Sequence, residues 1–201
     1  LARKVDVVVL DKTGTLTTGV MKVHEVNIPT SAHKVLGPTY TDFLNEKTIL
    51  STALSLELAN DHPVAQAIAS YTLANGAVRK EVVEFTQTPG AGVAGRVLIG
   101  AISPVVLIGT PKAIAHSATT FDTKIEEAIS RAEHLGYSVS VLAWDGVAIA
   151  VFATGDQLKS DAELTISTLT AMGITPWLVT GDNEESAGAI ARAVGIKGDH
   201  V

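Results

Sequence analysis

Asp11 is the residue best placed to do chemistry, because it lies between a largely apolar run and a glycine turn. Residues 11–17 read Asp-Lys-Thr-Gly-Thr-Leu-Thr, directly after the segment Val5–Leu10. A run of Val and Leu that ends at such a turn is typical of a buried parallel strand. The carboxyl ends of these strands form the ligand crevice of open α/β sheets, and an aspartate there can attack phosphorus. The sequence therefore predicts a nucleophilic carboxylate at the end of the first strand.

A second junction between a strand and a loop has the residue types of an anion site. The short apolar segment Ile174–Val179 runs into Thr180-Gly181-Asp182, and a helix is expected from Glu184. A hydroxyl and free main-chain N–H groups before a helix form a natural phosphate site. Asp182 has the alternative role of capping that helix. The presence of Asp11 favours the phosphate-contacting role.

The expected pattern of helices and strands changes along the chain from α/β to α+β and back to α/β. The economical arrangement is an α/β domain made of residues 1–19 and 154–201, interrupted by an α+β domain with an antiparallel sheet over residues 20–153. Residues 33–41 are expected to be a loop, Asp145-Gly146 a hairpin turn, and the segments near Thr18–Gly19 and Thr154–Gly155 flexible connections. Helices are expected at Glu46–Ala59, Pro63–Asn75, Asp122–Leu135, Ser160–Met172 and Glu184–Val194, and further strands at Met21–Ile28, Val82–Thr86, Gly92–Ile99, Val105–Ile108, Val139–Trp144 and Val147–Phe152.

Composition excludes several classes of function. The 201 residues are 46% apolar and carry a net charge of −6 without a run of Lys or Arg, which argues against nucleic acid as a partner. The absence of Cys excludes disulfides and thiolate metal sites. No apolar stretch approaches the roughly 20 residues that span a bilayer. The scattered histidines suggest no metal site of their own.

The run from Asp11 to Thr17 resembles the phosphorylation motif of the P-type ATPases, the ion pumps that form an aspartyl-phosphate. The resemblance implies a haloacid-dehalogenase-like, Rossmann-like phosphorylation domain that uses ATP and Mg²⁺. By this resemblance, Asp11 is the phosphorylated nucleophile. The Asp11 carboxylate and the Thr13 carbonyl are Mg²⁺ ligands. Lys12 either offsets the phosphate charge or points its side chain to solvent. Phosphatases of the same superfamily commonly carry an acid/base Asp where this chain has Thr13. A threonine cannot activate water at neutral pH, so the phosphoenzyme is expected to persist.

Two further segments resemble the same phosphorylation domain. Thr180-Gly181-Asp182 resembles its second phosphate-contacting motif. Asp156-Gln157-Leu158-Lys159 resembles the Asp-x-x-Lys segment where the chain re-enters the domain, although Lys159 taken alone is typical of a surface lysine. The family has a further Lys and a Gly-Asp-Gly-x-x-Asn-Asp motif, and neither occurs before Val201. We therefore expect an excised piece of a larger membrane protein that holds the nucleophile without the complete active site.

The middle of the chain resembles the nucleotide-binding domain of the heavy-metal subgroup. Glu57 precedes His62-Pro63 by five residues, and in that subgroup this Glu and His contact adenine. A lone His-Pro more often marks only a helix start, but its place after the Asp11 motif favours ATP binding. Gly90-Ala91-Gly92 resembles the subgroup's Gly-x-Gly, where missing side chains let the backbone approach the nucleotide; a plain turn is the alternative.

One segment departs from the subgroup's pattern. Gly109-Thr110-Pro111 stands where the family usually has a Gly-Asn-Arg-like sequence, so Gly109 and Thr110 are expected to contact the nucleotide. Pro111 cannot replace the basic side chain, which leaves Lys112 as a substitute or the contact weakened.

The resemblance covers essentially the whole chain. It implies the ATP-binding and aspartyl-phosphorylation region of a heavy-metal pump, on the cytoplasmic side of a membrane that the rest of the parent chain spans. Copper is the favoured metal, and a zinc, cadmium or cobalt pump is the alternative. A soluble phosphatase with a large cap domain and a non-catalytic nucleotide-binding module remain open. The piece itself is expected to be monomeric, with ATP as its direct partner and the metal ion as the parent's.

Overall fold

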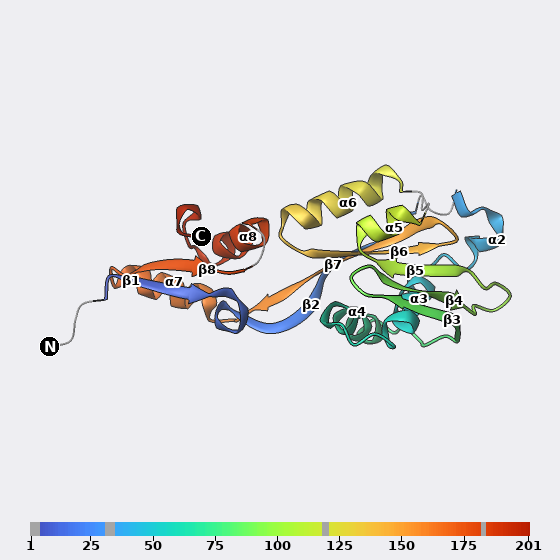
Figure 1. Cartoon of the computed structure of the whole chain (residues 1–201), viewed down its shortest axis with the longest axis horizontal. Coiled ribbons are helices and arrows are strands. Elements are labelled where there is room, and N and C mark those ends of the chain that lie inside the picture. The colour runs from blue at the N-terminus through green and yellow to red at the C-terminus, as the bar shows by residue number, and fades with distance from the viewer. Residues whose placement is uncertain (1–4, 31–34, 118–120, 182–183) are drawn as a thin grey trace. The chain divides into compact units, whose positions relative to one another are not determined.

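The chain forms two compact units in the computed structural model, which describes residues 5–30, 35–117, 121–181 and 184–201 (Figure 1). The first unit combines Leu1–Val20, Glu133–Tyr137 and Gly155–Val201, and the second combines Met21–Ala132 and Ser138–Thr154. No helix within the described ranges is both long and apolar enough to cross a membrane.

The first unit is built on two parallel strands, β1 (Val7–Asp11) and β8 (Thr175–Val179). Helices α7 (Ala162–Ala171) and α8 (Glu184–Val194) supply the other half of its core, and the short helix η2 (Gly198–His200) follows them. The prediction of a fully buried first strand is wrong: Val7 and Val9 are 51% and 62% exposed. The reason is that the described elements of this unit cover one face of the sheet, the face that Leu10 and Leu178 share with α7 and α8.

The second unit is a six-stranded sheet with helices on both faces. Its strand order is β2-β7-β6-β5-β4-β3, and the pairs from β7 to β3 are antiparallel. Figure 1 shows α3 and α4 on one face and α5 and α6 on the other. The strands are β2 (Thr17–Asn27), β3 (Val82–Thr88), β4 (Gly92–Val97), β5 (Val105–Gly109), β6 (Ser138–Trp144) and β7 (Val147–Leu158), and the helices are α2 (Pro38–Thr41), α3 (Glu46–Glu57), α4 (Pro63–Ala74), α5 (Pro111–His116) and α6 (Thr123–His134).

The main core of this unit lies between the sheet and the helix pair α3 and α4. Leu50 and Leu54 of α3 and Ile68 of α4 pack in one cluster with Trp144 and Phe152 of the sheet. All five side chains are essentially inaccessible to solvent. Burial of such large apolar groups is the dominant stabilising contribution, and it holds the C-terminal end of α3 against the strands.

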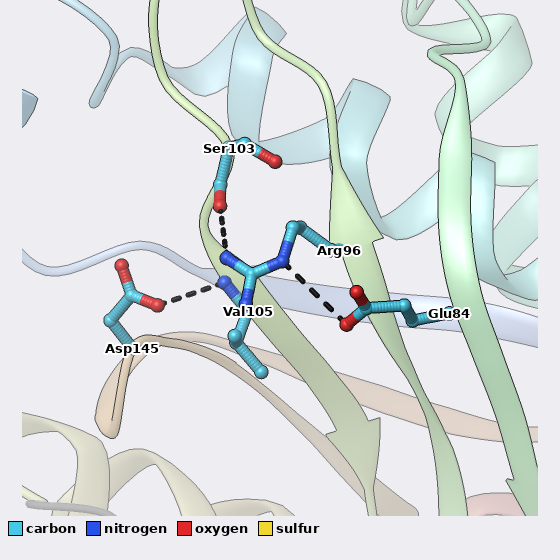
Figure 2. A network of polar contacts seen from close by, with 5 residues as sticks. All are labelled: Glu84, Arg96, Ser103, Val105 and Asp145. Carbon is cyan, nitrogen blue, oxygen red and sulfur yellow. Dashed lines mark hydrogen bonds and ion pairs between the residues drawn. The ribbon is translucent and has the colours of Figure 1, made fainter.

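A polar network fastens one end of the sheet (Figure 2). Arg96 Nη1 donates to the carbonyl of Ser103 at 2.9 Å, and its Nε lies 3.7 Å from Glu84 Oε2. Asp145 Oδ1 accepts from the Val105 amide at 2.8 Å. Asp145 and Gly146 both have positive φ, 42° and 80°, as a type I′ hairpin turn requires. The predicted hairpin between β6 and β7 is therefore confirmed.

One other local prediction is wrong. Residues 38–41, expected in a loop, form the helical turn α2, because Gly37 at φ 80° turns the chain and Pro38 takes the first helical position. The connections near Thr18–Gly19 and Thr154–Gly155 lie within strands β2 and β7, and their flexibility stays a prediction.

Candidate functional site

Strand pairing in the first unit brings the two phosphate motifs to one edge. Asp11 is the last residue of β1 and is the register partner of Val179, the last residue of β8. Because the strands are parallel, Asp11 and Thr180 both lie at the carboxyl end of the sheet, where α/β folds place their ligands. Asp11 and Gly181 are exposed and Thr180 is half-buried. Asp182, predicted to contact phosphate, lies outside the described residues.

The loop after Asp11 is a single tight turn, η1 (Lys12–Leu16), with Gly14 at φ 79°. Thr13 is exposed, whereas Lys12 is only 8% exposed. The alternative in which Lys12 points to solvent is thus wrong. Lys159 does not behave as an ordinary surface lysine either, because its Nζ donates to the Gly14 carbonyl at 2.6 Å. Lys159 therefore ties residues 156–159 to the turn that follows Asp11.

Thr17 makes a second link between the same two segments. Its Oγ1 lies 2.5 Å from Asp156 Oδ2 and 3.0 Å from the Lys12 carbonyl, and it accepts from the Gly14 amide at 3.3 Å. Thr17 is fully buried, and its contact with the Lys12 carbonyl is buried as well, whereas those with Gly14 and Asp156 are partly buried. Together with the bond from Lys159, they link the turn to residues 156–159.

The second unit contains a cavity of about 550 Å³, a size usual for small-molecule sites. All six predicted nucleotide-contacting residues line it, although they come from separate segments of the chain: Glu57, His62, Gly90, Gly92, Gly109 and Thr110. The tertiary structure thus brings together residues that the sequence spreads over more than fifty positions. That they contact a nucleotide remains a prediction.

Glu57 is the last residue of α3 and is 5% exposed. Burial raises the pKa of its carboxyl from 4.5 to about 7, and the hydrogen bond from Asn60 Nδ2, at 3.0 Å, opposes the rise. The carboxyl can therefore accept a hydrogen bond when ionised and donate one when protonated, both near neutral pH.

His62 caps the N-terminus of α4, and Pro63 takes the first helical position. Its Nδ1 accepts from the Val64 amide at 3.3 Å. In the neutral ring the proton is therefore on Nε2, which is left as a donor. The exposed side chain lines the cavity, so the ring offers both a face and an N–H to a ligand.

Two of the cavity glycines are required by the approach of strands β4 and β5. Gly92 and Gly109 are register partners. A Cβ on Gly92 would lie 2.2 Å from the Ile108 carbonyl oxygen, and one on Gly109 would lie 2.2 Å from the Ala91 oxygen. The absence of side chains at Gly92 and Gly109 thus allows the backbones of β4 and β5 to approach each other closely at the cavity wall. Gly90 is different, because it has open space around it but a φ of +73°.

Thr110 and Lys112 occupy different positions relative to the cavity. Thr110 lines it and also caps α5, since its Oγ1 accepts from the Ala113 amide at 3.3 Å. Lys112 is exposed on α5 and is not among the lining residues.

Sequence reasoning missed several polar residues of the cavity. They belong to the connection between α3 and α4 and to strands whose neighbours only the folded sheet decides: Asn60, Asp61, Gln87, Thr88, Ser138 and Ser140. Asp61 directly precedes the His62-Pro63 motif, and no motif marks the others. The spacing of Asn60 and Asp61 between Glu57 and His62 was the available indication for those two.

The comparison with protein families decides the classification. A model of the haloacid dehalogenase-like hydrolases matches residues 5–200. The chain belongs to this family. The prediction of a haloacid-dehalogenase-like fold with an inserted antiparallel-sheet domain is confirmed.

The chain is also similar to metal-transporting P-type ATPases, which confirms that predicted resemblance. It is 34% identical over 194 residues to a probable copper-importing P-type ATPase A of Enterococcus hirae, covering 96% of this chain and 24% of the relative. It is 36% identical to a copper-exporting P-type ATPase of Mycobacterium tuberculosis, covering 96% and 23%. The chain thus spans about a quarter of the length of these relatives.

The chain is also similar to solved structures of ATPases. The chain matches a zinc-transporting PIB-type ATPase in its E2.Pi state with a TM-score of 0.78 and 27% identity, covering 96% of this chain and 28% of that one. The catalytic domain of a CPx-ATPase, CopB-B, shares the fold with a TM-score of 0.62 at 20% identity, covering 96% and 59%.

Proposed function

We propose that this chain is the ATP-binding and aspartyl-phosphorylation region of a heavy-metal-transporting ATPase and lies on the cytoplasmic side of its membrane. The observation that carries the proposal is the cavity of the second unit, which gathers Glu57, His62 and the glycines of two segments. The relatives that match nearly the whole chain are named as P-type ATPases, which supports the same function.

The adenine end of ATP is proposed to bind at Glu57 and His62. An ionised Glu57 carboxyl accepts from the exocyclic amino group, and the exposed His62 ring offers a face for stacking. Both contacts are of the kind that orients a ligand inside a largely apolar pocket. The backbone at Gly90, Gly92 and Gly109 forms another part of the cavity wall.

The phosphoryl group is proposed to pass to Asp11. A carboxylate oxygen of Asp11 forms a bond to the γ-phosphorus while the bond from that phosphorus to the β,γ-bridging oxygen breaks, and ADP leaves with the electron pair. The charge of the transferred phosphoryl group is offset by Lys12, the Thr180 hydroxyl and the Gly181 amide. Thr13 supplies no base to hydrolyse the intermediate at once.

The oxygen donors at Asp11 and Thr13 fit Mg²⁺ if the ion is also coordinated by the phosphates of the substrate. The Asp11 carboxylate and the Thr13 carbonyl are oxygen ligands, which this ion prefers together with substrate phosphates. The described residues bring together no group of three or more His, Cys, Asp or Glu side chains. When bound, the ion would neutralise phosphate charge; the protein residues hold the turn that presents Asp11.

Copper is the proposed transported metal, because the two relatives described above, from Enterococcus hirae and Mycobacterium tuberculosis, are both named for copper. Zinc is the second candidate, since the structure with a TM-score of 0.78 is named for zinc. The test is the full-length parent: Asp11→Ala should abolish both acid-stable, hydroxylamine-sensitive labelling from γ-labelled ATP and metal export. Labelling that persists would place the nucleophile elsewhere. Stimulation by zinc and not by copper would keep the chemistry and replace the metal.

A further inference from the structure

Asn60 joins three segments at the rim of the cavity with one side chain. Its Nδ2 donates to Glu57 Oε2 at 3.0 Å. Its Oδ1 accepts from the His62 amide at 3.1 Å and from Gln87 Nε2 at 3.2 Å. The end of α3, the start of α4 and strand β3 therefore meet at a single amide group.

These contacts fix the two groups proposed to hold adenine. A carboxyl whose one oxygen is held at 3.0 Å keeps its plane and its second oxygen in a defined direction. The hydrogen bond to the His62 amide sets the main chain immediately before α4, and the His62 ring is then locked by its own bond to Val64. Glu57 is buried, so it cannot exchange the Asn60 bond for bulk water without cost.

We propose that Asn60 is a positioning residue of the cavity, whose amide holds the Glu57 carboxyl and the His62 backbone in the arrangement that receives the base of a nucleotide. The inference rests on the proposed ATP binding and adds a residue that the motif does not contain. Asn60 acts through Glu57 and His62 and needs no contact with the ligand itself.

The first test uses the nucleotide-free chain and follows the ¹³C shift of the Glu57 carboxyl with pH. Loss of the donor in Asn60→Ala should raise the midpoint of the titration above about 7, because the bond from Asn60 opposes the effect of burial. Asn60→Asp, which keeps the acceptor but sets a carboxylate against Glu57, should raise it further. Asp61 and His62 are the other titratable residues that line the cavity, and both stay in place in these variants.

The second test is ATP affinity by titration calorimetry. Asn60→Ala should weaken binding about tenfold, the size of one hydrogen bond to a buried group (about 1.4 kcal/mol). The matched control is Asn75→Ala: Asn75 follows α4, donates its side-chain amide to the Tyr71 carbonyl and lies outside the cavity. It should leave both the Glu57 titration and the affinity unchanged.

The outcomes separate this inference from the function on which it rests. A raised midpoint together with weaker binding, in Asn60→Ala or in the similarly sized, uncharged Asn60→Leu if the first does not fold, supports the positioning role. An unchanged midpoint, or unchanged affinity despite a raised midpoint, overturns it while leaving ATP binding by the unaltered chain intact. Failure of the unaltered chain to bind ATP overturns the proposed function and this role with it.

Discussion

The replacement Glu57→Gln tests how burial of a carboxyl affects the stability of the second unit. Glu57 has a pKa of about 7 in the folded chain and 4.5 as the ordinary value. As the pH rises above about 4.5, the unfolded chain loses this proton while the folded chain retains it until about pH 7. The folded state thus binds more protons over this range, and its stability falls as the pH rises.

The magnitude follows from the two values. At about 1.36 kcal/mol for each pH unit between them, the buried carboxyl costs about 3 kcal/mol at pH 8 and under about 1 kcal/mol at pH 5. A glutamine side chain at this position has nearly the same shape, can still accept from Asn60 and does not ionise. The variant should therefore be more stable than the original chain by about 3 kcal/mol at pH 8, with the gain nearly gone at pH 5.

The assay is urea unfolding at pH 5, 6, 7 and 8, followed by tryptophan fluorescence in a Trp177→Phe background. The remaining Trp144 lies in the same core cluster as α3, so it reports on the second unit alone. Glu127→Gln, at an exposed position on α6, removes a similar charge and should keep the original pH dependence. Parallel stability curves for Glu57→Gln and the original chain from pH 5 to 8 would refute the reasoning.

Four further outcomes are expected. His62→Gln should weaken ATP binding by about 1–2 kcal/mol in calorimetry, because it removes a ring contact and a hydrogen bond; unchanged affinity would remove His62 from the site. Gly109→Ala should lower the free energy of urea unfolding of the second unit by about 2 kcal/mol or more, since its Cβ would lie 2.2 Å from the Ala91 oxygen, whereas Gly198→Ala meets open space and should change little. Thr17→Val should lower the thermal stability of the first unit by about 1–2 kcal/mol through loss of the buried hydroxyl, and Thr17→Ser should restore most of it. The 201-residue chain should show no sustained phosphate release from ATP, as the described residues gather no acidic cluster for Mg²⁺; turnover that Asp11→Asn abolishes would contradict this.

The sequence by itself determined the features that depend on neighbouring residues. The run from Asp11 to Thr17 predicted the family to which the chain is similar, and apolar spacing located helices such as Glu46–Glu57 within two residues at either end. Asp145-Gly146 specified its turn because both positions require positive φ. These features follow from backbone conformation and local periodicity, which a single segment already contains.

Only the tertiary structure decided what surrounds each group. Glu57 carries no mark of burial in its own segment, and its raised pKa arises because α3 ends against the sheet. The roles of Asn60 and Gln87 depend on β3 lying near the connection between α3 and α4, and the glycine at 109 is required by the backbone of Ala91. Desolvation, steric closeness and hydrogen bonding between distant segments are properties of packing, so no pattern along the chain specifies them.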